Sequence, residues 1–110
     1  MSGDAFYRKI TASVLQRYCE LEDGVLGKDL YFDPRVSDYR IDVERALRRL
    51  APSHYDVLIY LHRDGLTQAD AVRTAGIASL RPDLLVAQIE ATTGKLLLSA
   101  GLVDIKSYLR

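Results

Sequence analysis

Apolar side chains recur every four residues in the first part of the chain, between Asp4 and Glu22. The residues that mark this interval are Phe6, Ile10, Val14 and Tyr18. An interval of four brings them to one face of a helix, so this segment is predicted to be helical, with Asp4 as its amino-terminal cap. The next segment, from Asp23 to Ser37, keeps no period and contains two glycines and Pro34. We expect it to form an ordered loop that packs on the core.

The rest of the chain shows helical periods separated by capping residues. The predicted helices run from Asp38 to Leu50, from the cap Ser53 to Gly65, from Gln68 to Ala75 and from Pro82 to Gly101, with a last turn from Asp104 to Leu109. Thr67 and Asp70 form a variant of the capping box before the shortest of these helices, and Gly76 is placed to close it. Gly94 weakens the helix that begins at Pro82. The pattern predicts an all-α fold, a compact bundle of about five helices.

Composition narrows the class of protein. With 110 residues, of which 48% are hydrophobic, the chain is expected to form one helical domain over residues 1–110, with 4–37 as an amino-terminal helix and loop. Its 15 basic and 15 acidic residues cancel, so any attachment to nucleic acid must come from a local patch. The single cysteine, the absence of a signal-like start and the absence of a long apolar run predict a cytoplasmic protein that does not use a membrane.

Residues with catalytic or metal-binding chemistry are few and poorly placed. His54 and His62 lie eight residues apart without further ligands nearby in the sequence, so we interpret them as partly exposed helix histidines. Cys19 stands beside Glu20 rather than beside a cation, which is typical of a core or boundary thiol. No glycine pattern suits a phosphate loop. We therefore expect a binding protein that is not an enzyme and that has no cofactor.

Four arginines on one predicted helix are the most distinctive surface feature. They are Arg40, Arg45, Arg48 and Arg49. Their guanidinium groups suit bidentate contacts with phosphates or with the carboxylates of a protein partner. They also suit an ordinary solvated face, because Asp42 and Glu44 lie among them and can neutralise part of the charge. Both interpretations stay open from the sequence.

The segment from Ala46 to Ile77 combines a leucine-rich helix, a proline, a helix with the pair Val57-Leu58, and Gly65-Leu66-Thr67 before a short helix. In this order it resembles the fourth region of bacterial RNA polymerase sigma factors, which contains a helix-turn-helix. The resemblance covers about a third of the chain. It extends more weakly to the small sigma-like activators of phage-derived gene clusters.

The segment departs from the family pattern, so the helix-turn-helix is degenerate. Val72 stands where the family usually has alanine, and the turn is lengthened to reach Pro82. The helix that would read bases, from Pro82 to Thr93, offers Asp83, Gln88 and Glu90 but no lysine or arginine. Base reading in the major groove uses cationic and amide side chains, so this helix is expected to read DNA poorly.

The resemblance implies a function that does not need base reading. In sigma factors this region docks on the flap of the polymerase beta subunit, near the RNA exit channel. It therefore implies a transcription regulator that binds RNA polymerase, in promoter activation or in elongation and antitermination, with DNA or RNA of the complex as a further partner. We expect Arg45, Arg48 and Arg49 to make polar contacts, and Arg81 and Lys95 to contact nucleic acid.

Two alternatives remain. The chain could be a stand-alone helix-turn-helix DNA-binding regulator that contacts phosphates through Arg40, Arg45, Arg48 and Arg49. It could also be a phage-type structural adaptor that oligomerises through apolar surfaces.

Overall fold

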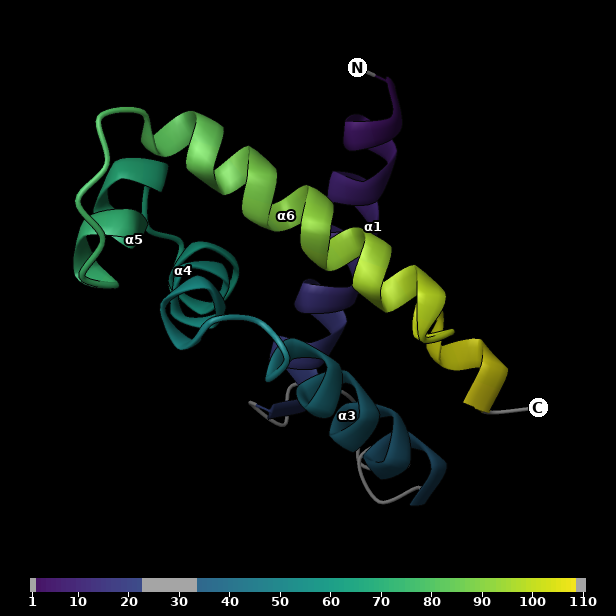
Figure 1. The fold of residues 1–110 in the computed structure, drawn as a ribbon. Helices are drawn as coiled ribbons and strands as arrows, with labels where there is room; N and C mark the ends of the chain where they lie inside the picture. Colours follow the sequence, from purple (N-terminus) through teal and green to yellow (C-terminus); the bar gives the residue numbers. More distant parts are fainter. Residues whose placement is uncertain (1, 23–33, 109–110) are drawn as a thin grey trace.

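The computed structural model describes residues 2–22 and 34–108 of the chain, and within these residues all regular secondary structure is helical (Figure 1). The α-helices are α1 (Ser2–Glu22), α3 (Pro34–Leu47), α4 (Pro52–His62), α5 (Gln68–Thr74) and α6 (Pro82–Ser99). A short 3-10 helix, η1 (Ile105–Tyr108), follows α6. The prediction of an all-α fold of about five helices is confirmed.

The start of α3 was predicted wrongly. We expected a loop to Ser37, but α3 begins at Pro34, which suits the first turn of a helix because its fixed φ is helical and its missing N–H costs nothing there. The early start brings Val36 onto the same buried face as Tyr39 and Val43. The remainder of the predicted loop, 23–33, lies outside the described residues.

The junction between α3 and α4 also differs from the prediction. Helix α3 ends at Leu47 instead of Leu50, and the chain tightens into a turn in which Leu50 N donates to Leu47 O at 3.1 Å. Ala51 is extended, with ψ at 140°, as expected for a residue before proline. Ala51 and not Ser53 is therefore the amino-terminal cap of α4, with Pro52 in its first turn.

Other helix ends agree more closely with the sequence. Thr67 caps α5 by accepting a hydrogen bond from Asp70 N at 3.2 Å, as predicted. Gly76 follows α5 with φ at +81°, a left-handed conformation that glycine adopts without strain. Asp4 is not the cap of α1, because that helix already begins at Ser2 and Asp4 lies in its first turn.

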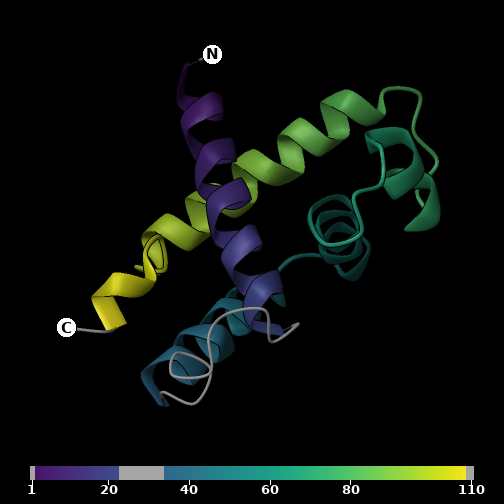
Figure 2. The ribbon, with the colours of Figure 1, turned by 180° about the vertical axis from the view of Figure 1, so that it is seen from behind.

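Helix α1 crosses α6 near the middle of both, and this is the most extensive helix pair of the fold (Figures 1 and 2). Gly94 lies at the crossing and does not interrupt α6, contrary to the sequence-based expectation of a weakened helix. A Cβ at Gly94 would lie 2.8 Å from Tyr7 Cα, so the missing side chain is what lets the helices approach. Thr11 Oγ1, from α1, donates to Glu90 O of α6 at 2.6 Å.

One continuous cluster of buried apolar side chains joins the five α-helices. Helix α1 contributes Val14 and Leu15, α3 contributes Tyr39 and Leu47, α4 contributes Val57 and Leu58, α5 contributes Val72, and α6 contributes Val86 and Leu97. Burial of Cys19 agrees with the predicted core or boundary thiol. Of the helices in the described part of the chain, none combines the length and the apolar character needed to cross a membrane.

Candidate functional site

Helices α4, α5 and the start of α6 gather at one end of the molecule (Figure 1), which we call the α5–α6 corner. Leu66 N donates to Tyr60 O at 3.0 Å before α5, and Ile77 N donates to Val72 O at 3.1 Å after it. The connection to α6 runs over residues 75–81. The helices follow one another in the order that a helix-turn-helix requires, and the helix-turn-helix itself stays a prediction.

The surface of the α5–α6 corner carries exposed apolar side chains beside two ion pairs, Arg73 with Asp70 and Arg81 with Asp83. Leu80 in the connection is 99% exposed and Leu84 in the first turn of α6 is 57% exposed. Beside them lies a shallow depression of about 510 Å³, and Val72, Ile77, Leu80 and Pro82 are among the residues that line it. Large apolar side chains at such exposure are unfavourable in water and are typical of a contact surface for another macromolecule.

Arg81, which we expected to contact nucleic acid, is engaged by its neighbour Asp83. The guanidinium makes a bidentate contact, with Nε 3.2 Å from Oδ1 and Nη2 3.1 Å from Oδ2. The hydrogen bond from Arg81 lowers the pKa of the Asp83 carboxyl, so that side chain stays charged and offsets the cation. Both groups are fully accessible to solvent, so the pair contributes little to stability.

One side of α6 belongs to the core, and the opposite side, with Gln88, Thr92 and Lys95, is exposed. Val86, Ile89, Thr93 and Leu97 are buried at helical spacing. Lys95, the other expected nucleic-acid contact, is exposed, with Nζ 5.3 Å from the centroid of the Tyr7 ring. A rise of 1.5 Å per residue separates Arg81 and Lys95 by about 21 Å along the helix, so the structure does not bring them together.

Glu90 was expected on the exposed face of a base-reading helix, and that expectation is wrong. It is only 8% exposed and lies between α1 and α4. Arg8 Nε lies 3.2 Å from its Oε2, and His62 Nε2 lies 3.5 Å from its Oε1. Burial raises the pKa of the Glu90 carboxyl, but the contacts with His62 and Arg8 together outweigh it, and the net pKa is lowered. The sequence holds no signal for this, because α1 is distant along the chain.

The arginine cluster divides into two halves. Arg40 Nη1 and Arg48 Nη2 lie 3.9 Å and 3.8 Å from the Glu44 carboxylate, one helical turn away on either side. Arg48 also lies over the Tyr55 ring, with Cζ 4.2 Å from its centroid. The interpretation of a partly neutralised face therefore fits Arg40 and Arg48.

The other two arginines face a different surface. Arg45 and Arg49 are exposed and line a recess of about 270 Å³ between the end of α3 and the end of α6, which we call the arginine notch. Its other principal residues are Asp42, Ala46, Leu102 and Tyr108. Within the described residues neither Arg45 nor Arg49 forms an ion pair. The notch therefore holds the two cations of the cluster that are available to a ligand.

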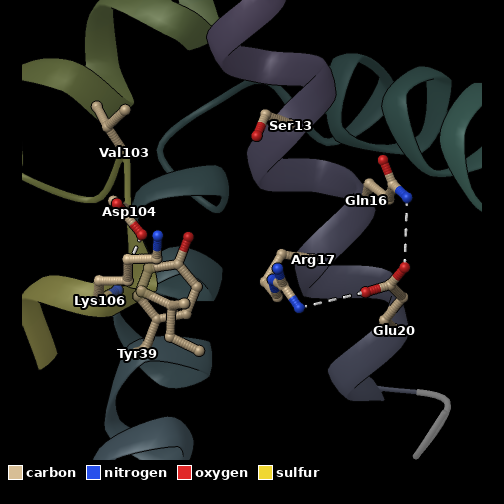
Figure 3. Close-up of a pocket in the computed structure, with 9 residues that line it drawn as sticks. Ser13, Gln16, Arg17, Glu20, Tyr39, Val103, Asp104 and Lys106 are labelled. Atoms are coloured by element: carbon tan, nitrogen blue, oxygen red, sulfur yellow. Dashed lines mark hydrogen bonds and ion pairs between the residues drawn. The ribbon is translucent and has the colours of Figure 1, made fainter. Parts of the chain in front are cut away.

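A further cleft of about 510 Å³ lies between α1 and η1, over Tyr39 (Figure 3). Arg17 Nη1 lies 3.7 Å from Glu20 Oε2 on its α1 wall. Asp104 Oδ1 accepts from the backbone N–H of Lys106 at 2.9 Å on the facing wall. Two cations and two carboxylates thus cancel, and the cleft carries no net charge.

Tyr39 at the base of this cleft is a structural residue. It is 1% exposed, and its hydroxyl donates to Leu102 O at 3.0 Å. Burial raises its pKa to about 12; the nearby Arg17 lowers it and Asp104 raises it. A hydroxyl held neutral and bonded to the backbone is not poised for acid–base chemistry near neutral pH.

The histidines of the chain lie on one helix. His54 and His62 are both partly buried in α4, as the sequence predicted. In the segments that the structure describes, no three histidine, cysteine, aspartate or glutamate side chains lie close enough to hold a metal ion. The α5–α6 corner, with its exposed leucines, and the arginine notch, with two cations that form no ion pair among the described residues, are the candidate binding surfaces.

Comparison of the chain with protein family models, with curated proteins and with solved structures gave no match.

Proposed function

We propose that this protein is a transcription regulator that binds bacterial RNA polymerase through its sigma region 4-like segment. The contact lies near the beta flap and the RNA exit channel, and it serves promoter activation or elongation and antitermination. The observation that carries the proposal is the apolar surface of the α5–α6 corner, with Leu80 and Leu84 exposed and Arg81 tied to Asp83.

An apolar corner favours a protein partner over bare DNA. Affinity for a duplex comes mainly from cations that neutralise phosphates. At the corner, the cation Arg81 is already paired with the carboxylate of Asp83. Burial of leucine side chains against another protein, by contrast, stabilises the complex by roughly 25 cal/mol per Å² of apolar surface removed from water. Zero net charge points the same way. The resemblance of the segment from Ala46 to Ile77 to sigma region 4 is what supports RNA polymerase as that protein.

Arginines supply the polar contacts in this proposal. Arg45 and Arg49 are exposed in the arginine notch, whereas Arg48 is exposed on the other surface, over the Tyr55 ring. Lys95, exposed farther along α6, is the cation best placed to meet DNA or RNA held by the polymerase. These contacts orient the protein on its partner, whereas the corner supplies most of the buried area.

Binding to purified polymerase tests the proposal. Tagged protein is titrated into fluorescently labelled core polymerase and into core polymerase that lacks the tip of the beta flap. We expect saturable binding to the intact enzyme and its loss with the truncated one. Absence of binding to intact core polymerase would overturn the proposal.

A pair of variants locates the contact. Leu80→Glu places a charge in the corner and should abolish binding. Leu98→Glu is the matched control, because Leu98 is 43% exposed near the other end of α6. Both variants should keep the helical circular dichroism signal of the parent protein. Equal loss of binding in both variants would remove the corner from the contact.

The alternative of a DNA-binding regulator rests on Arg45 and Arg49, the two cluster cations without an ion pair among the described residues. It requires binding to duplex DNA that weakens steeply as salt rises. A gel-shift series from low to moderate salt, with the polymerase titration beside it, separates the two functions.

A further inference from the structure

We infer that the arginine notch is a binding site for an acidic amphipathic segment of a protein, in which a carboxylate pairs with Arg45 and Arg49 and a neighbouring apolar side chain enters the recess. This inference deepens the proposed function. It depends on that function in one respect, that the partner is a protein.

The interior of the notch is apolar and fixed. Ala46 and Leu102 are both buried among the residues that line it. Leu102 is held by the hydrogen bond from the Tyr39 hydroxyl, and the Tyr39 ring meets the Tyr108 ring edge to face at 5.2 Å between centroids. A recess built in advance orders little on binding, so a single apolar side chain can gain from entering it.

Asp42, the one carboxylate among the described residues that line the notch, is already occupied. Tyr108 donates its hydroxyl proton to Asp42 Oδ2 at 2.7 Å. Burial, followed by the hydrogen bond to Asp42, raises the pKa of Tyr108 to about 12, so the hydroxyl stays a donor at neutral pH. Asp42 therefore faces Tyr108, and the two guanidinium groups keep their donors for a ligand. Among the described residues that line the notch, the two cations Arg45 and Arg49 and the carboxylate of Asp42 sum to one net positive charge.

This combination suits a protein carboxylate better than a nucleic-acid backbone. A duplex presents a phosphate about every 1.7 Å along its axis and is held by a run of cations. The adjacent cations cannot extend the notch into such a run, because Arg40 and Arg48 pair with Glu44. Asp42 would also repel a second phosphate. A segment with one carboxylate beside an apolar side chain matches the two cations and the apolar interior together.

Fluorescence anisotropy with designed peptides tests the site. The probe is a fluorescein-labelled peptide with leucine and glutamate at helical spacing; a matched peptide has every glutamate replaced by glutamine, and a labelled oligothymidylate represents nucleic acid. We expect saturable binding of the acidic peptide to the full chain, with affinity at least about tenfold above that of the glutamine peptide. Absence of binding, or stronger binding of the oligonucleotide, would overturn the inference.

Variants assign the binding to the notch. Arg45→Glu with Arg49→Glu should weaken acidic-peptide binding at least about tenfold, whereas the control pair Lys9→Glu with Arg63→Glu changes net charge equally and should leave it within about twofold. Asp42→Asn removes the carboxylate of the notch and should tighten binding. Equal losses in the two charge-reversal pairs, or no gain in Asp42→Asn, would contradict the assignment. Peptide binding with no polymerase binding would overturn the proposed function and leave this site standing.

Discussion

Replacement of Gly94 by alanine should destabilise the protein, although alanine is the better helix former. Gly94 lies in the interior of α6, where α1 crosses it. A Cβ built on Gly94 would lie 2.6 Å from the carbonyl carbon and 2.8 Å from the Cα of Tyr7. Both are backbone atoms, so no rotamer change relieves the overlap, and α1 must move away from α6.

The size of the effect follows from two opposing contributions. Alanine in a helix interior is favoured over glycine by about 1 kcal/mol. Forcing an extra methyl group into a packed contact costs typically 1–3 kcal/mol, and the upper end of that range, about 3 kcal/mol, applies where backbone must shift. The shift also strains the hydrogen bond from Thr11 Oγ1 to Glu90 O. We expect Gly94→Ala to lower the free energy of unfolding by about 2 kcal/mol.

Urea denaturation followed by circular dichroism measures this difference. Thr92→Ala is the control, because Thr92 is exposed on the same helix and its replacement tests helix propensity alone. The control should be neutral or stabilising by about 0.5 kcal/mol. If Gly94→Ala instead gains stability as an exposed glycine would, the close crossing of α1 over α6 is refuted.

Three further substitutions probe single interactions. Thr67→Ala removes the cap of α5 and should lower the free energy of unfolding by about 1 kcal/mol, as measured by thermal or urea unfolding. Tyr39→Phe leaves Leu102 O without its buried partner and should cost about 1–2 kcal/mol. Folding raises the pKa of Tyr39 from 10.0 to about 12, so the stability that Tyr39 contributes is complete below pH 10 and is lost as the pH rises towards 12. The free energy of unfolding of Tyr39→Phe should therefore fall less steeply at alkaline pH than that of the parent protein. Glu90→Gln removes the ion pair with Arg8 and should cost about 1 kcal/mol near neutral pH, since Arg8 is partly exposed. The lowered pKa of Glu90 means that this stability is present above the unfolded value of 4.5 and is lost as pH falls, so the variant should flatten the acid side of the stability profile.

Each of these predictions has an outcome that contradicts it. Thr67→Ser keeps a capping oxygen and should retain most of the parent stability, so equal losses in the serine and alanine variants would argue against the cap. An unchanged alkaline decline in Tyr39→Phe would show that another group titrates there. If the free energy of unfolding of Glu90→Gln falls with decreasing pH as steeply as that of the parent protein, the pKa of Glu90 does not change on folding.

Features set by a few neighbouring residues were predictable from the sequence. The cap at Thr67 and the left-handed Gly76 depend only on local hydrogen bonds and backbone freedom, and both are found where expected. The start of α3 has a local signal in Pro34, which suits a first helical turn, but the pattern of apolar residues alone did not reveal it. Burial of Val36 and Tyr39 against other elements then stabilises this part of the helix.

The candidate site was predictable in composition but not in arrangement. The sequence identifies arginines on one helix, yet it does not assign Arg45 and Arg49 to a recess, since Leu102 and Tyr108 come from the far end of the chain. Burial of Glu90 has the same cause. It depends on α1 lying across α6, a contact between segments about eighty residues apart.

The crossing of α1 and α6 decides where a partner can bind this protein. It commits one side of α6 to the core, and the exposed side of the helix carries the uncharged Gln88 and Thr92 in its middle. One end presents the apolar α5–α6 corner and the other presents the arginine notch, and 18 residues of helix hold them about 27 Å apart. Two modest contacts held at a fixed distance strengthen each other on one partner, because the second binds at the high effective concentration that the first creates. We therefore propose that the corner and the notch contact the same protein partner, with α6 as the rigid spacer between them.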